Sequence, residues 1–265
     1  MPLDLPPADE RVSRRPTVST VICQIRFEEQ PSVSEGALAI EFHERVGGPS
    51  GRYSKIEPAE GANRILFEMG PGGPLQQQTT RRTGWSLQAE NDSWSLVLLP
   101  DNVALQADGE GYVGWDSFVE RLTETLDALA EVVSPAVEQR VGLRFVDRIR
   151  GGDLGVVDPT GWEQYIAPEF LGPITVPGIG QAVRGGQQQL LLDAGNGATC
   201  GLRQGLAAIT GDDRSVYVVD CDFYREGVRQ FDPTAILEVV GGFREQSDSV
   251  FGAAATPALL DALSK

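Results

Sequence analysis

The chain has 265 residues, with 22 lysine and arginine side chains against 38 aspartate and glutamate side chains, and a formal net charge of -16. This balance excludes a generally basic nucleic-acid-binding protein and a polybasic membrane-surface protein. Hydrophobic residues make up 41% of the chain, which is enough to build a core. No apolar run reaches the roughly 18 residues that a membrane-spanning helix needs.

The N-terminal segment MPLDLPPADERVSRRP lacks the apolar stretch of a secretory signal, so we expect a cytoplasmic protein. The three cysteines, Cys23, Cys200 and Cys221, stand in apolar runs rather than in metal-binding pairs, which fits a reducing compartment. All basic side chains except Lys55 and Lys265 are arginines, a bias typical of a GC-rich bacterial genome.

Apolar and polar side chains alternate along several stretches, which is the period of β-strands. In the first half of the chain these stretches are 21–27, 53–56, 64–69, 84–89, 94–99 and 103–107. In the second half they are 141–146, 188–193, 199–209 and 215–224. Segments rich in Gly, Pro, Asn and Asp separate consecutive stretches, as in antiparallel hairpins.

Two long helices are predicted. Over 115–129 the apolar side chains recur at helical spacing, at Phe118, Leu122, Leu126 and Leu129. Residues 232–251 begin with an Asp-Pro pair, which suits the first turn of a helix. Shorter helices are predicted over 37–46 and 257–263, and a helical stretch interrupted by Pro168 is predicted over 162–170.

The order strand, helix, several antiparallel strands and long helix occurs twice. We interpret it as an internal duplication, with an irregular arm over 1–18, a first half over 19–135 and a second half over 136–265. The predicted fold class is α+β, a curved antiparallel sheet with the two long helices on one side. This order is similar to that of the TATA-binding-protein-like fold, a resemblance that implies architecture and no activity.

Two strand motifs resemble those of a sporadically distributed prokaryotic family of proteins of similar length. Residues 140–149 read RVGLRFVDRI and fit the family pattern G-L-R-aromatic-x-Asn/Asp-x-Ile, with Asp147 where asparagine is more frequent. Residues 220–224 read DCDFY and fit its D-x-D-x-Tyr pattern. The resemblance covers the chain from about Val18 to Leu263. No activity comes with it, so it implies no catalytic residue.

Arginines gather on one side of the strand over 140–149. Residues of even number in this strand are mostly arginine, and residues of odd number are mostly apolar. Because side chains alternate between the faces of a sheet, we expect the apolar ones to face the helices and the arginines to lie on the opposite, open face. The candidate ligand-binding residues are Arg140, Arg144 and Arg148, with Gln24 and Arg26 at the matching positions of the first-half strand.

Two interpretations of these arginines are open. Guanidinium groups are suited to bind the phosphate or carboxylate groups of a ligand. They also pair with carboxylates on the same sheet, here Asp147, Asp220 and Asp222. We favour internal pairing, and for Arg144 in particular, because it lies in the middle of its strand.

Asp220 and Asp222 are the candidate metal ligands, because residues two apart on a strand face the same side. Carboxylates of this kind hold divalent cations, with Asp193, Asp212 or Asp213 as further ligands. Pairing with arginines is the favoured alternative. No cofactor is expected, since the chain has no glycine-rich phosphate-binding motif between a strand and a helix.

The single histidine, His43, is expected to be a solvated helix residue rather than a catalytic base. With no catalytic grouping recognised, we expect a non-enzymatic binding or adaptor protein with a protein partner and no membrane association. The partner would bind the open face or the loops over 70–83 and 171–187. The alternative is a nucleic-acid or nucleotide-binding protein that uses the arginines. A metal-dependent phosphoryl-transfer enzyme is the least favoured hypothesis.

Overall fold

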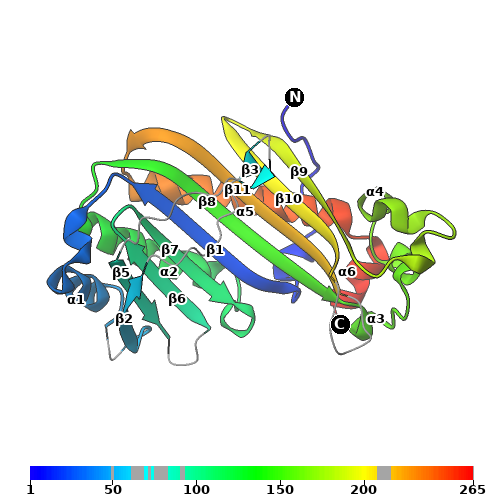
Figure 1. Cartoon of the computed structure of the whole chain (residues 1–265), viewed down its shortest axis with the longest axis horizontal. Helices are drawn as coiled ribbons and strands as arrows, with labels where there is room; N and C mark the ends of the chain where they lie inside the picture. The colour runs from blue at the N-terminus through cyan, green and yellow to red at the C-terminus, as the bar shows by residue number, and fades with distance from the viewer. Residues whose placement is uncertain are drawn as a thin grey trace.

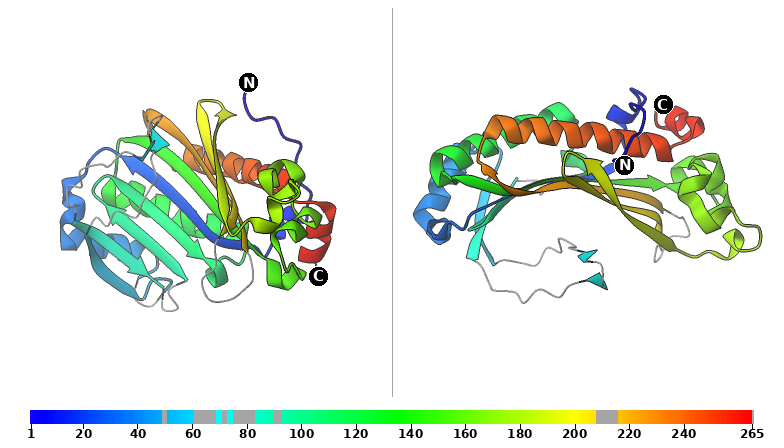
Figure 2. Two further views of the ribbon diagram at one scale, coloured as in Figure 1. Left: turned by 45° about the vertical axis from the view of Figure 1, so that its right-hand side comes forward. Right: turned by 90° about the horizontal axis from the view of Figure 1, so that it is seen from above.

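The computed structural model describes residues 1–48, 51–60, 69–70, 73–74, 83–89, 93–207 and 216–264. Within them the chain forms one curved, nine-stranded antiparallel sheet with helices along one of its faces (Figures 1 and 2). The predicted antiparallel α+β architecture is therefore correct. Most of the predicted strand over 64–69 and of the loop over 71–78, and the turn over 211–213, lie outside the described residues.

Each predicted stretch within the described residues has a counterpart, but the strands Val137–Arg150 and Val216–Gln230 are several residues longer than predicted. The strands are β1 (Val18–Phe27), β2 (Lys55–Glu60), β3 (Met69–Gly70), β4 (Gly73–Pro74), β5 (Thr83–Gln88), β6 (Trp94–Leu99), β7 (Asn102–Asp108), β8 (Val137–Arg150), β9 (Gly186–Gly195), β10 (Ala198–Ala207) and β11 (Val216–Gln230). The helices are α1 (Gly36–Arg45), α2 (Trp115–Ala128), α3 (Gly151–Leu154), α4 (Pro168–Leu171), α5 (Pro233–Ala254) and α6 (Pro257–Leu263). A π-helical turn over Leu129–Val133 extends α2.

Both halves of the chain contribute to the same sheet. Its strand order is β2-β5-β6-β7-β1-β8-β11-β10-β9, and β3 and β4 form a separate two-stranded hairpin. At the centre β1 lies antiparallel to β8, with Cys23 opposite Leu143. On its other side β8 pairs with β11, the longest strand. The predicted boundary between the halves falls on the short turn between α2 and β8.

Helices α2 and α5 cover one face of the sheet, and the core lies between (Figure 2). From α2, Phe118 and Leu122 are fully buried. From α5, Phe243 stacks on Phe223 of β11 with ring centroids 5.9 Å apart. From Val21 to Phe27 of β1 and along β8 the buried apolar side chains are those of odd number, as the alternation predicted. The polar even-numbered side chains therefore lie on the face opposite α2 and α5, which is here called the open face.

The ends of the helices show how local sequence sets them. Asp232 accepts hydrogen bonds from the backbone N–H groups of Thr234 at 2.9 Å and Ala235 at 3.2 Å, which caps α5 as predicted. The helical stretch predicted over 162–170, with an interruption at Pro168, is indeed interrupted. Proline at 168 has no N–H to donate, so a 3-10 segment over Pro159–Gln164 and the short α4 take its place. No helix within the described ranges is long and apolar enough to cross a membrane.

Candidate functional site

The open face brings together most of the side chains that the sequence singled out. In the β1–β8 register Arg26 lies opposite Arg140 and Gln24 lies opposite Gly142. In the β8–β11 register Asp222 lies opposite Arg144. The candidates on β1, β8 and β11 thus share one face of three adjacent strands. Arg148 lies further along β8, opposite Val218, with an exposed side chain.

Arg144 pairs internally with Asp220. Its Nε and Nη2 atoms donate to the two carboxylate oxygens of Asp220, both at 2.7 Å. This is the diagonal neighbour, since Asp222 is the residue directly opposite Arg144. The hydrogen bonds to Asp220 raise the pKa of Arg144. A second guanidinium, that of Arg203 on β10, lies 3.5 Å from the same carboxylate.

The Arg140 side chain lies along its strand, over the position of Gly142, because a glycine there has no side chain to occupy the space. A Cβ atom on Gly142 would lie 2.7 Å from Arg140 Nη1. In the space that glycine leaves, Nη1 donates to Oε1 of Gln24 at 3.0 Å, and the guanidinium lies 4.6 Å from the centre of the Tyr224 ring. Gly142, the glycine of the 140–149 motif, therefore sets the position of Arg140, which lies two residues before it on the same face of the strand.

The charges of Arg140 and Asp222 are close but are not joined by a hydrogen bond. Nη2 of Arg140 lies 3.7 Å from Oδ2 of Asp222, which is longer than a hydrogen bond. Arg140 is only 7% exposed. Burial lowers the pKa of Arg140, and the nearby positive charge of Arg26 lowers it further. Burial likewise raises the pKa of Asp222 despite its arginine neighbours. For both groups burial is the largest cause of the shift, and the attraction between them opposes it.

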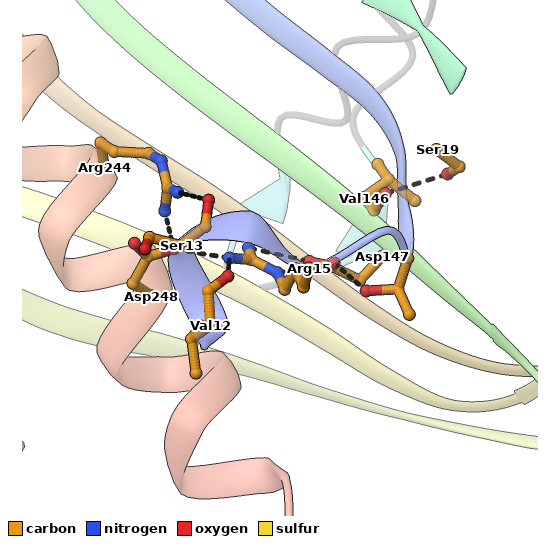
Figure 3. Close-up of polar contacts among 9 residues, drawn as sticks. Val12, Ser13, Arg15, Ser19, Val146, Asp147, Arg244 and Asp248 are labelled. Carbon is orange, nitrogen blue, oxygen red and sulfur yellow. Dashed lines mark hydrogen bonds and ion pairs between the residues drawn. The ribbon is translucent and has the colours of Figure 1, made fainter. Parts of the chain in front are cut away.

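Asp147 lies on the opposite face of β8 from these arginines. It belongs to the odd-numbered residues that face α2 and α5 and is 2% exposed. Arg15 of the N-terminal arm donates from Nε and Nη2 to its two oxygens at 2.7 and 3.1 Å (Figure 3). Thr17 donates its hydroxyl to the same carboxylate at 2.7 Å. The interpretation that Asp147 pairs with the arginines of β8 is therefore wrong, because strand alternation separates them.

Arg15 also reaches helix α5. Its Nη1 donates to Oδ1 of Asp248 at 2.5 Å and to the carbonyl oxygen of Val12 at 3.0 Å. Arg244 of α5 forms an ion pair with Asp248 and donates to the carbonyl oxygen of Ser13 at 3.1 Å (Figure 3). We call this buried group of Arg15, Asp147, Arg244 and Asp248 the arm clamp. Its charges balance, and it ties the arm over 1–18, expected to be irregular, to both β8 and α5.

The arm clamp contains a strongly desolvated cation. Burial lowers the pKa of Arg244 to about 10, and repulsion from the nearby Arg15 contributes to the shift. Aromatic rings partly replace the lost water, since the Arg244 guanidinium lies 5.1 Å from the centre of the Phe145 ring and that of Arg15 lies 4.6 Å from the Phe251 ring. Both faces of the sheet thus hold arginine–aspartate pairs, but only this group lies beneath helices.

The candidate metal ligands meet arginines instead of one another. Among the described residues, no group of three or more His, Cys, Asp or Glu side chains comes together to hold a metal ion. Both oxygens of Asp220 accept hydrogen bonds from Arg144. Asp193 lies two strands away from β11 on β9. Asp212 and Asp213 lie outside the described residues.

His43 is not solvated, contrary to expectation. It is 4% exposed, and its Nε2 donates to the carbonyl oxygen of Tyr53 at 2.7 Å. The backbone of Tyr53 therefore gives this buried side chain a hydrogen-bond partner. Cys23, Cys200 and Cys221 are buried thiols, as expected for small apolar side chains, and burial raises the pKa of Cys23 to about 12.

Comparisons with known proteins add little to this description. No known protein family and no curated protein matches the chain. Among solved structures, the chain is similar to the crystal structure of the di-domain ARO/CYC StfQ from the steffimycin biosynthetic pathway. The match has a TM-score of 0.18 and 11% identity, and covers 88% of this chain and 96% of that one. A TM-score this low carries no argument about fold or function.

Proposed function

We propose that this is a binding protein whose open face receives a protein partner at Arg140, Asp222 and Tyr224. The proposal rests on the Arg140–Asp222 pair. Two largely desolvated charges lie 3.7 Å apart, beyond hydrogen-bond distance, on the face of the sheet that α2 and α5 leave uncovered. Burial of charge is unfavourable unless hydrogen bonds satisfy it. Two short hydrogen bonds join Arg144 to Asp220, whereas Arg140 donates to Gln24 and lies beyond hydrogen-bond distance of Asp222.

A peptide segment has the chemistry that completes this pair. A backbone carbonyl or a side-chain carboxylate would accept from Arg140, and a backbone N–H would donate to Asp222. Arginine and tyrosine are enriched at protein interfaces, and here the Tyr224 ring lies against the Arg140 guanidinium. The overall charge of -16 would speed the approach of a partner that is basic overall.

A phosphate-bearing ligand, either nucleic acid or nucleotide, is the second candidate. The open face of β1, β8, β10 and β11 carries more arginines than carboxylates. The residues are Arg26, Arg140, Arg144, Arg148, Arg150 and Arg203 against Asp220, Asp222 and Glu226. We rank this candidate second because Asp220 and Asp222 lie among the arginines and repel phosphate. An electrophoretic shift at two salt concentrations tests it, since phosphate binding weakens steeply as salt rises.

A photo-crosslinking amino acid at Tyr224, introduced in the native host, tests the first proposal. We expect a covalent adduct with a protein. The matched control position is Glu245, an exposed residue of α5 on the other side of the sheet, where no such adduct is expected. Gly142→Ala displaces the Arg140 guanidinium without removing its charge, and is expected to abolish the adduct. Equal adducts at both positions, or an adduct with nucleic acid alone, would overturn the proposal.

We further propose the internal duplication and the TATA-binding-protein-like arrangement. The strand order supports them, because β7 and β11, β6 and β10, and β5 and β9 follow in pairs on either side of the central β1 and β8. Superposition of residues 19–135 on 136–265 by about half a turn tests the duplication. We also propose that the chain belongs to the prokaryotic family, on the motifs over 140–149 and 220–224. A cytoplasmic location is part of the same proposal.

A further inference from the structure

Strand β9 is one edge of the nine-stranded sheet (Figure 1). An edge strand presents backbone N–H and C=O groups that are able to pair with another strand. The carbonyl of Asp193 accepts from the N–H of Leu3 in the N-terminal arm at 2.7 Å, so it points outward, away from β10. Because backbone groups alternate along a strand, those of Gln187, Gln189 and Leu191 point outward as well.

The two edges of the sheet differ in the features that prevent strand pairing. At the other edge, β2 has the sequence KIEPAE, and charged residues and proline are devices by which natural edge strands avoid association. From Gly186 to Leu192, β9 has neither a charged residue nor a proline. Two of its leucines are exposed, Leu190 by 48% and Leu191 by 66%. The β9 edge therefore has the sequence of a strand that accepts a neighbour.

We propose that two copies of this chain pair their β9 strands antiparallel about a twofold axis, which joins their sheets into one. Each copy carries a charge of -16, so copies repel wherever acidic surfaces meet. The uncharged stretch over 186–192 allows close approach without placing like charges opposite each other. A second copy offers the same uncharged stretch in return, as a twofold interface requires.

The geometry of the edge sets the register. With the axis at Gln189, the outward-pointing groups of Gln187, Gln189 and Leu191 meet those of Leu191, Gln189 and Gln187 in the other copy. Asp193, which is already bonded to Leu3, lies outside the paired segment. Leu190 of one copy then lies across from Gln188 of the other, so the exposed leucines lose water on both faces of the joined sheet.

Sedimentation equilibrium over a dilution series of the full chain tests this inference. The wild type is expected to approach twice the 28.5 kDa mass of one chain at high concentration and to dissociate on dilution. Gln189→Pro removes an outward N–H and no hydrogen bond to β10, so it is expected to give a folded monomer. Leu191→Lys is also expected to give a monomer. The added lysine lowers the net negative charge of each copy and so reduces the overall repulsion between copies. A loss of the dimer would therefore come from the change at the β9 edge.

Val113→Lys is the matched control, because it places the same charge on a valine that is 79% exposed before α2. It is expected to leave the dimer intact. Circular dichroism reports whether each variant folds, and Leu191→Lys alone decides the matter if the proline variant unfolds. A monomeric wild type, or a dimer that Leu191→Lys leaves intact, would overturn the inference. Neither outcome affects the proposed partner site, whose crosslinking position lies on the open face.

Discussion

Arg15 and Asp147 lie 132 residues apart in the sequence and form a bidentate ion pair beneath the helices, with side chains 1% and 2% exposed. The pair attaches the N-terminal arm to the central strand β8. Arg15 extends the link to Asp248, so the arm, the sheet and α5 meet in one charged group. Because this group is buried, removal of one charge leaves another buried charge without its partner, which destabilises the fold.

Asp147→Ala is the direct test of the arm clamp. It leaves two buried arginines to share Asp248 and removes the acceptor of Thr17. Removal of one member of a buried ion pair costs about 3–5 kcal/mol, and we expect a loss of this size in the free energy of unfolding in urea. The double variant Arg15→Met with Asp147→Leu, which removes both charges, is expected to recover most of it. A single variant as stable as the wild type would contradict the role of the clamp.

Arg144→Ala tests the internal pairing on the open face. The change removes two hydrogen bonds from the carboxylate of Asp220, which is 6% exposed. We expect a loss of roughly 1–3 kcal/mol and a lower melting temperature. Added phosphate should not restore the stability, because the missing charge is positive. A variant with unchanged melting temperature that no longer responds to phosphate would instead assign Arg144 to a ligand.

Local patterns predicted the strands, α2, α5 and the shared face of the arginines, because alternation and helical spacing depend on near neighbours. They did not predict which carboxylate each arginine meets. Arg144 bonds the diagonal Asp220 rather than the opposite Asp222, which depends on the register of β8 against β11 and on side-chain reach. The partner of Asp147 comes from an arm without any periodicity. The sequence held one signal that this partner exists, since Asp147 is an aspartate among the buried, odd-numbered residues of β8.

Asp222→Asn tests whether the burial of Asp222 outweighs its attraction to Arg140. Burial raises the pKa of Asp222 above its usual 3.8, so the folded state binds more protons than the unfolded state between these two values. Stability from this group is therefore greatest below pH 3.8 and is lost as pH rises through the folded-state pKa. Asparagine mimics the protonated form, so the variant should exceed the wild type in stability at pH 7.

The advantage of Asp222→Asn should shrink as the pH falls towards 3.8, where the wild-type carboxyl is itself protonated. Urea unfolding of both proteins along a pH series measures the difference. Asp220→Asn is the control, and it should be destabilising at pH 7 because both oxygens of Asp220 accept from Arg144. If Asp222→Asn also destabilises at pH 7, the attraction of Arg140 outweighs the burial of the pair.

Gly242→Ala should stabilise the protein. Gly242 lies inside α5 with an exposed position, and a Cβ atom there would meet nothing within 4 Å. Glycine in a helix is about 0.5–1 kcal/mol less favourable than alanine, chiefly because the unfolded glycine chain is more flexible. We therefore expect a gain of about that size and a higher melting temperature. The contrasting change is Gly205→Ala. Gly205 has a φ of +145°, and a Cβ atom there would lie only 2.0 Å from the carbonyl oxygen of Gly186. It should destabilise the β9–β10 pair, and equal effects of the two substitutions would contradict this account of α5.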